Sequence, residues 1–208
     1  MPLAASQTPD YPPVFRGLSL VAGHPALDLV NTVKYRGADR PQDKLKSFSD
    51  LIDWALTAGI ISTADSTGLS DAQNGPALLG KIRVLRESLW CLFNADQTDK
   101  KRYAQALNTI EKAISSLRYK VKIDPQTGTL RQHITVRTPN DLIARIVDSI
   151  ADLLTRRESY LIKTCDGCDC DWLFVDRTKA RRRRWCDTRT CGNLARSRNF
   201  RNKQKQSH

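Results

Sequence analysis

The stretch CDGCDCDWLFVDRTKARRRRWCDTRTCGNLARSRNF, residues 165–200, concentrates cysteine and arginine near the end of the chain. It holds five of the six cysteines of the 208-residue sequence and eight of its arginines. The sixth cysteine, Cys91, lies on an apolar segment, where a small core residue is expected. The five clustered cysteines, by contrast, lie in a polar segment and are not expected to be core residues.

The spacing of the cysteines indicates a metal site. Cys165 and Cys168 are separated by two residues, Cys186 and Cys191 follow after a gap of seventeen, and four such thiols suit tetrahedral zinc. We predict one structural Zn²⁺ held by these four, with Gly167 providing the positive φ of a knuckle. Cys170 is expected to stand outside the site, because a C-x-C pair is a less usual knuckle. Disulfides or an iron-sulfur cluster are the weaker alternatives for the same cysteines.

The residues between the two pairs predict a small zinc-dependent domain. The segments WLFV (172–175) and RRRRW (181–185) can form a hairpin in which Trp172 lies opposite Trp185. A segment this polar buries too little apolar surface to offset the conformational entropy that it loses on folding. Metal binding therefore has to supply part of its folding free energy. We predict a treble-clef-like or ribbon-like finger over residues 161–205.

Positive charge is concentrated in the same region. Residues 177–205 contain twelve Lys or Arg and a single acid, Asp187, whereas the rest of the chain has 22 basic and 21 acidic residues. A positive electrostatic potential concentrated in one segment favours the binding of a polyanion, above all nucleic acid. A short helix is expected beyond Cys191, and the candidate DNA contacts are Arg181, Arg182, Arg183, Arg184, Arg189, Asn193, Arg196, Arg198, Arg201 and Lys203.

The first 160 residues read as a mainly helical α+β domain. Helical apolar spacing is seen after Pro25, behind Ser47, from Pro76 to Asn94, from Tyr103 to Leu117 and after Thr138. Strand-like alternation around a turn predicts a β-hairpin within residues 119–136. We assign residues 1–15 to a flexible tail and 16–160 to a sensor or dimerisation domain. The helix that begins after Pro25 has a polar side, formed by Asp28, Asn31 and Thr32. These three residues are candidate ligand contacts, and the alternative is that they stabilise the fold.

The composition favours a cytoplasmic protein that does not enter the membrane. No apolar run reaches the ~18 residues of a membrane helix, and the first basic residue is Arg16, so no secretory signal is evident. In a reducing compartment, clustered cysteines usually bind metal.

At the cysteine stretch the chain resembles the CGNR zinc-finger family. The matching residues are Cys165, Cys168, Trp172, Phe174, Asp176, Arg183, Arg184, Trp185, Cys186, Cys191, Gly192 and Asn193. The resemblance implies that the four cysteines bind zinc and that the finger binds DNA. Leu194 replaces the final arginine of the motif, so a contact made by that arginine is not carried over.

A second resemblance lies near the N-terminus. The segment PALDLVNT, residues 25–32, is similar to the start of the ABATE domain, which is fused to this finger in proteins described as stress-induced transcription regulators. The combined resemblance implies a bacterial regulator that binds double-stranded DNA.

Three functions are weighed on this basis. The first is a sequence-specific DNA-binding transcription regulator whose N-terminal domain senses a small-molecule effector or forms a homodimer. The second is an RNA-binding or ribosome-associated zinc protein, because phosphate attraction is common to both nucleic acids. The third, an enzyme, is not expected, because His24, His133 and His208 form no recognisable catalytic motif.

Overall fold

A computed structural model describes residues 12–36, 39–69, 73–94, 98–156, 158–167 and 170–206, with the side chains of residues 131, 205 and 206 left aside. Residues 1–11 of the expected tail lie outside this description. The fold is mainly helical with small antiparallel hairpins, which confirms the predicted α+β class. No helix within these ranges combines the length and the apolar character needed to cross a membrane.

The helices predicted from apolar periodicity are present, and four of them follow the start signals noted at Pro25, Ser47, Pro76 and Thr138, whereas the short α3 was not predicted. Ser47 and Thr138 each form a capping box with the aspartate three residues later, so that the first turns of α2 and α6 are satisfied. Pro25 occupies the first turn of α1. The helices are α1 (Pro25–Val30), α2 (Phe48–Thr57), α3 (Thr63–Ser66), α4 (Gly75–Phe93), α5 (Lys100–Ser115), α6 (Pro139–Thr155) and α7 (Asn193–Gln206), with a 3-10 turn η1 (Ser159–Leu161) and a π-helical turn η2 (Thr188–Gly192).

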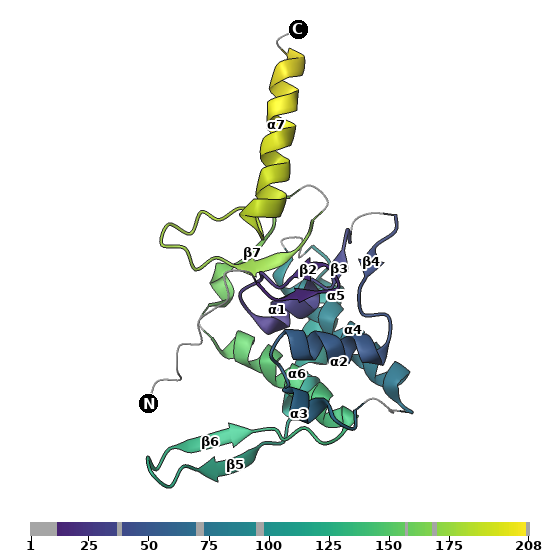
Figure 1. Ribbon diagram of the computed structural model, residues 1–208, viewed down its shortest axis with the longest axis vertical. Coiled ribbons are helices and arrows are strands. Elements are labelled where there is room, and N and C mark those ends of the chain that lie inside the picture. Colours follow the sequence, from purple (N-terminus) through teal and green to yellow (C-terminus); the bar gives the residue numbers. More distant parts are fainter. Residues whose placement is uncertain are drawn as a thin grey trace.

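Within the described residues, the strands form four separate two-stranded antiparallel pairs. The predicted hairpin within residues 119–136 is present as the β5–β6 pair and projects from the helical body at the end opposite α7 (Figure 1). The pairs are β1 (Val14–Phe15) with β2 (Leu18–Ser19), β3 (Val33–Lys34) with β4 (Gln42–Asp43), β5 (Lys120–Ile123) with β6 (Leu130–His133), and β7 (Ile162–Thr164) with β8 (Leu173–Val175).

One predicted pairing is wrong. Residues 181–185 form no strand, and β8 pairs instead with β7, so that Phe174 lies opposite Lys163. Residues 176–184 form a loop, in which Arg181 takes a positive φ of 48°. Trp172 is buried and donates from Nε1 to the carbonyl of Val33 at 3.1 Å, so it faces the helical body rather than Trp185.

The core of the molecule includes the finger. Apolar side chains of α1, α2, α4 and α6 form one continuous buried cluster, and Leu173, Phe174 and Val175 of β8 belong to it. Leu173 and Phe174 have no exposed surface. The C-terminal segment is therefore built onto the helical body and is not a separate appendage, except for α7, which extends away from it (Figure 1).

Candidate metal centre and nucleic-acid interface

Four cysteine sulfurs converge at the junction of the body and α7. They belong to Cys165, Cys170, Cys186 and Cys191, and all four lie within 4.8 Å of one another. The sulfur of Cys186 is 3.7 Å from that of Cys170 and 3.7 Å from that of Cys191. A zinc tetrahedron with bonds of about 2.3 Å has edges of about 3.8 Å, so these separations fit a single zinc ion.

Backbone N–H groups and a glycine shape the cluster. Gly167 and Cys186 donate from their backbone nitrogens to the sulfur of Cys165, at 3.3 and 3.2 Å. A Cβ at Gly167 would lie 3.0 Å from the sulfur of Cys191, so a larger residue would push into the cluster. The glycine is thus needed for close approach, whereas the sequence suggested that it was needed for a positive φ.

The identity of the ligands differs from the expectation in one respect. Cys170, expected to stand outside the site, lies within the cluster, where its sulfur contacts Cys186. Cys168, expected to be a ligand, lies outside the described residues and stays a prediction. In the cluster as the structure describes it, four residues separate Cys165 from Cys170, and four residues also separate Cys186 from Cys191.

The thiols influence one another strongly. Hydrogen bonds from the thiols of Cys170 and Cys186 lower the pKa of Cys165, and its thiolate in turn raises the pKa of both donors. Without a cation the cluster can carry one thiolate readily but resists further ionisation. This donor set suits a divalent soft cation, and zinc would supply folding energy here, as in other structural four-cysteine sites.

Asn31 attaches β8 to the helical body. Its side-chain N–H₂ donates to the carbonyl of Leu173 at 2.9 Å, and its Oδ1 accepts from the Leu173 N–H at 2.9 Å. The amide therefore takes the place of a neighbouring strand on the side of β8 that β7 does not cover. Two residues further along β8, the N–H of Val175 donates to the carbonyl of Ala22 at 2.8 Å.

Asp28 and Thr32, the other two candidate ligand contacts, also have protein partners. Asp28 is buried and accepts from the N–H of Ala22 at 3.1 Å. The Thr32 hydroxyl accepts a hydrogen bond from the guanidinium of Arg86 at 3.0 Å. The same guanidinium donates to both carboxylate oxygens of Asp43 at 2.8 Å. These contacts favour the fold-stabilising alternative for all three residues.

Asp176 organises the loop between β8 and Cys186. Its side chain has no exposed surface and accepts from Lys163 Nζ at 2.7 Å, from the Thr178 hydroxyl at 2.6 Å and from the backbone N–H of Arg183 at 2.9 Å. Burial opposes its ionisation, but these hydrogen bonds outweigh it and lower the pKa of Asp176. The carboxylate therefore draws the loop inward at both ends.

Arg183, one of the candidate DNA contacts, points into the protein. Its guanidinium lies over the Phe174 ring, 4.4 Å from the centroid, and donates to the carbonyls of Trp185, Cys186 and Val21. These bonds connect the metal centre with the N-terminal part of the chain. The half-buried side chain is engaged in structural contacts, and its contact with DNA stays a prediction.

The other arginines of the loop lie on the surface. Arg181 is exposed and stacks over Tyr160, with its guanidinium carbon 4.9 Å from the ring centroid. Arg184 is paired with Asp166 at 2.7 Å and remains two-thirds exposed. Arg182 is exposed and makes no ion pair with any described residue. Arg189 lies at the start of η2, 3.9 Å from Asp187.

The predicted helix beyond Cys191 is confirmed as α7. It continues from η2 and projects away from the body (Figure 1), and it contains no acidic residue. Asn193 donates to the carbonyl of Arg189 at 2.8 Å and accepts from Arg196, so it stabilises the first turn. The remaining candidates on this helix, Arg198, Arg201 and Lys203, are exposed.

The sequence did not identify the structural roles of Asn31, Asp176 and Arg183. Asp176 was noted only as a motif position, Arg183 was expected to contact DNA, and Asn31 was a candidate ligand contact with a fold-stabilising role as the alternative. Asn31 and Arg183 bond to backbone carbonyls more than 140 positions away, and Asp176 joins Lys163 of β7 to the loop that follows β8, so no local pattern encodes these partners.

Comparisons with known proteins agree with this architecture. Residues 23–157, more than half of the chain, match the ABATE family, described as "Putative stress-induced transcription regulator". Residues 162–204 match the CGNR zinc finger. No curated protein shows a significant match to the sequence. With its helical body and its four-thiol metal centre, the chain belongs to the ABATE family and carries a C-terminal CGNR zinc finger.

Proposed function

We propose that this protein is a DNA-binding transcription regulator in which the zinc centre presents α7 to duplex DNA. The observation that carries the proposal is the combination of charge and position in α7. Arg196, Arg198, Arg201 and Lys203 lie on one helix without an acidic residue, and the helix leaves the body instead of packing on it. A surface of this kind attracts phosphates by releasing counterions.

The dimensions of α7 support duplex DNA. Its 14 residues give a length of about 21 Å, and an α-helix fits the major groove of B-form DNA. Phe200 is 63% exposed and offers an apolar contact of the kind made with thymine methyl groups. The deep, narrow major groove of an RNA helix does not admit such an element.

The loop 177–184 provides a second basic surface beside the helix. Asp176 and Arg183 hold the loop from the inside, so that Arg181 and Arg182 are directed to solvent. We assign phosphate contacts to these two residues, and both phosphate and base contacts to α7. Leu194, which replaces the family's arginine, is 60% exposed and carries no charge.

Titration of labelled duplex DNA by fluorescence anisotropy tests the proposal. Specific sites would first be selected from random duplexes with the zinc-loaded chain. The double variant Arg198→Gln with Arg201→Gln should weaken binding and reduce the slope of log K against log salt by about one for each lost phosphate contact. The matched control is Lys100→Gln with Lys101→Gln on α5, which should bind like the parent chain.

Two outcomes would contradict DNA reading by α7. One is an unchanged affinity and salt slope in the α7 variant. The other is tighter binding to structured RNA than to any selected duplex at physiological salt, which would favour the RNA-binding alternative.

We further propose that the helical body, residues 16–160, regulates the finger, residues 161–205, and that the protein works in the cytoplasm as a regulator and not as an enzyme. A single finger offers a small interface, so specific binding is expected to need a homodimer formed through the body. Light scattering that gave a monomer both free and on DNA would remove the dimer.

A further inference from the structure

A small cavity lies between the helical body and the metal centre. Its volume is about 180 Å³. It is lined from the body by Gly17, Ser19, Val21, Lys34 and Tyr35, and from the finger by Cys170, Trp172, Cys186, Asp187, Thr190, Cys191 and Leu194. A molecule bound here would touch both parts of the protein at once.

The volume limits the size of a ligand. An engineered apolar cavity of about 150 Å³ is enough to bind benzene. The cavity beside the metal centre is slightly larger, so it can accept one aromatic ring with one small substituent. Drug-sized molecules and nucleotides, which need several hundred Å³, do not fit.

The walls favour an aromatic ring. Trp172 is buried and lines the cavity, and Val21 and Leu194 add aliphatic residues to its wall. Leu194 is 60% exposed in the free protein, so a ligand would cover apolar surface that water now contacts. Tyr35, 41% exposed, provides a second aromatic edge.

The charges around the cavity select against an ionised ligand. The zinc-bound form of the four thiolates would carry a net negative charge, and Cys170, Cys186 and Cys191 line the cavity, so an anion would be repelled. The ammonium of Lys34 lies over the Trp172 ring, 5.7 Å from its centroid, so a second cation there would compete with it.

Lys34 instead favours a hydrogen-bond acceptor. No described carboxylate pairs with its ammonium, which can therefore donate to a ligand. Among the described residues that line the cavity, the only acid is Asp187, which accepts from the N–H of Arg189 at 3.0 Å and lies near its guanidinium, so it is already engaged.

We propose that this cavity binds a small, neutral aromatic molecule that carries one hydrogen-bond acceptor. The ring packs between Trp172 and the aliphatic side chains of Val21 and Leu194, and the acceptor takes a hydrogen bond from Lys34. The proposal does not depend on DNA binding, because it concerns a ligand of the zinc-loaded chain alone.

Calorimetric titration of the zinc-loaded full chain tests the ligand class with three probes of one size. Benzamide is neutral with an acceptor, benzoate is an anion and benzylamine is a cation at neutral pH. Benzamide is expected to bind at least about tenfold more tightly than the other two. Equal or tighter binding of benzoate or benzylamine, or no detectable binding of benzamide at millimolar concentration, would overturn the proposal.

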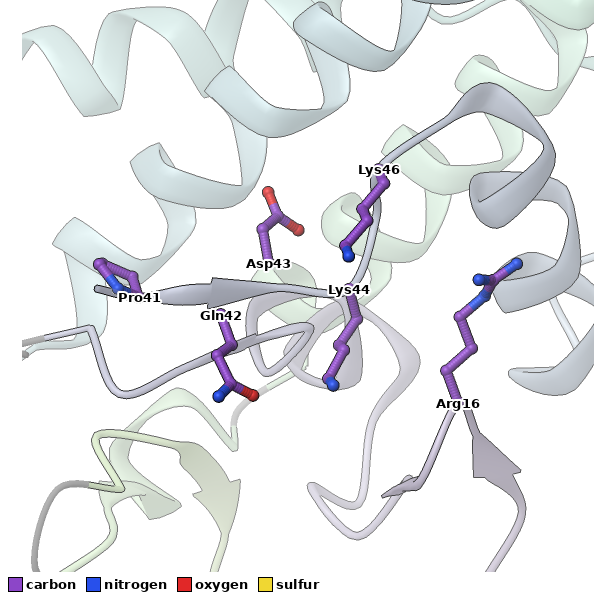
Figure 2. A pocket seen from close by; sticks show the side chains of 6 residues that line it. All are labelled: Arg16, Pro41, Gln42, Asp43, Lys44 and Lys46. Carbon is purple, nitrogen blue, oxygen red and sulfur yellow. The ribbon is translucent and has the colours of Figure 1, made fainter.

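Three variants place the site. Val21→Phe fills the cavity and should abolish benzamide binding, and Lys34→Met removes the donor and should weaken binding about tenfold. The matched control is Lys44→Met, because Lys44 lies near β4 in a different cavity with Arg16, Pro41, Gln42, Asp43 and Lys46 (Figure 2). Benzamide binding that is unaffected in Val21→Phe, or equally weakened in Lys44→Met, would place the ligand elsewhere.

The rate of zinc release measures benzamide binding independently of calorimetry. Bound benzamide would cover the sulfurs of Cys170 and Cys191, so transfer of zinc to a chelator should slow in proportion to occupancy. The effect should vanish in Val21→Phe. Zinc loss at the same rate with and without saturating benzamide would contradict a ligand at the metal centre.

Discussion

At the scale of single residues, the chief question is which cysteines hold the metal. Residues 165–170 offer three cysteines, and their spacing alone favours Cys165 with Cys168. The structure brings Cys170 to the cluster, because it lies two residues before the buried segment that begins at Trp172. The choice thus depends on packing beyond the knuckle.

Serine substitutions separate the two assignments. Cys170→Ser removes a sulfur of the cluster, so the zinc content should fall well below one ion per chain and the cobalt-loaded protein should lose the absorption of a four-thiolate site. Cys168→Ser in parallel tests the sequence-based assignment, and Cys91→Ser on α4 is the control outside the cluster. Full metal content in Cys170→Ser together with loss in Cys168→Ser would reverse our ligand set.

Asp28 should make the free energy of unfolding of the helical body depend on pH. Burial raises the pKa of this carboxyl to about 7, against the opposing effect of the Ala22 N–H. The unfolded carboxyl ionises near pH 4, so ionisation favours the unfolded state as the pH rises from about 4 to 7. Asp28 should therefore reduce the stability of the protein above neutral pH.

Asp28→Asn should remove this effect while its side-chain oxygen still accepts from Ala22. We expect the variant to gain up to about 4 kcal/mol relative to the parent at alkaline pH, and to show little gain near pH 5. Urea unfolding of both zinc-loaded proteins across this range measures the difference. A constant difference across the range would show that Asp28 ionises normally in the folded protein.

At the scale of elements, β8 connects the finger to the body. It pairs with β7 on one side, and the side chain of Asn31 and the carbonyl of Ala22 replace a strand on the other. The buried N–H and C=O of Leu173 depend on a single amide. Such groups are costly when they lose their partners.

Asn31→Leu keeps a similar volume but leaves both groups of Leu173 unpaired. We expect a loss of about 3 kcal/mol in the free energy of unfolding. Chemical denaturation followed by circular dichroism measures the loss, with exposed Asn199→Leu on α7 as the control, for which little change is expected. A loss below about 1 kcal/mol in Asn31→Leu would mean that water or another group replaces the amide.

At the scale of the whole molecule, the finger completes the core. Leu173, Phe174 and Val175 are buried in the same apolar cluster as α1 and α4. The burial of three such side chains contributes on the order of 6 kcal/mol, which is comparable to the stability of a whole domain. The helical body should therefore not tolerate the loss of the finger.

A chain ending at residue 160 tests this dependence. It should melt well below the full chain, or bind a hydrophobic dye in its native buffer, because the surface that β8 covers becomes exposed. Zinc chelation from the full chain should lower the melting temperature of the helical body as well. A truncated body with an unchanged melting temperature would show two independent domains.

Much of this architecture was predictable from the sequence. Apolar residues at helical spacing, with Ser47 and Thr138 as start signals, predicted the main helices because burial and capping are local properties. The cysteine cluster and its adjoining basic helix were predicted from ligand type and charge. The hairpin between 172–175 and 181–185 was wrong, because Asp176 draws residues 178–183 into a loop and β7 occupies the edge of β8.

The sequence by itself determined that thiols gather for a metal, that positive charge collects beyond them and that a helical body precedes them. Only the tertiary structure decided that Cys170 joins the cluster, that Arg183 turns inward while its neighbours face solvent, and that Asn31 pairs with Leu173, 142 positions away. The physical reason is the range of the interactions. Residue type and period fix burial and ligand chemistry locally, whereas hydrogen-bond partners and coordination are set where distant segments meet.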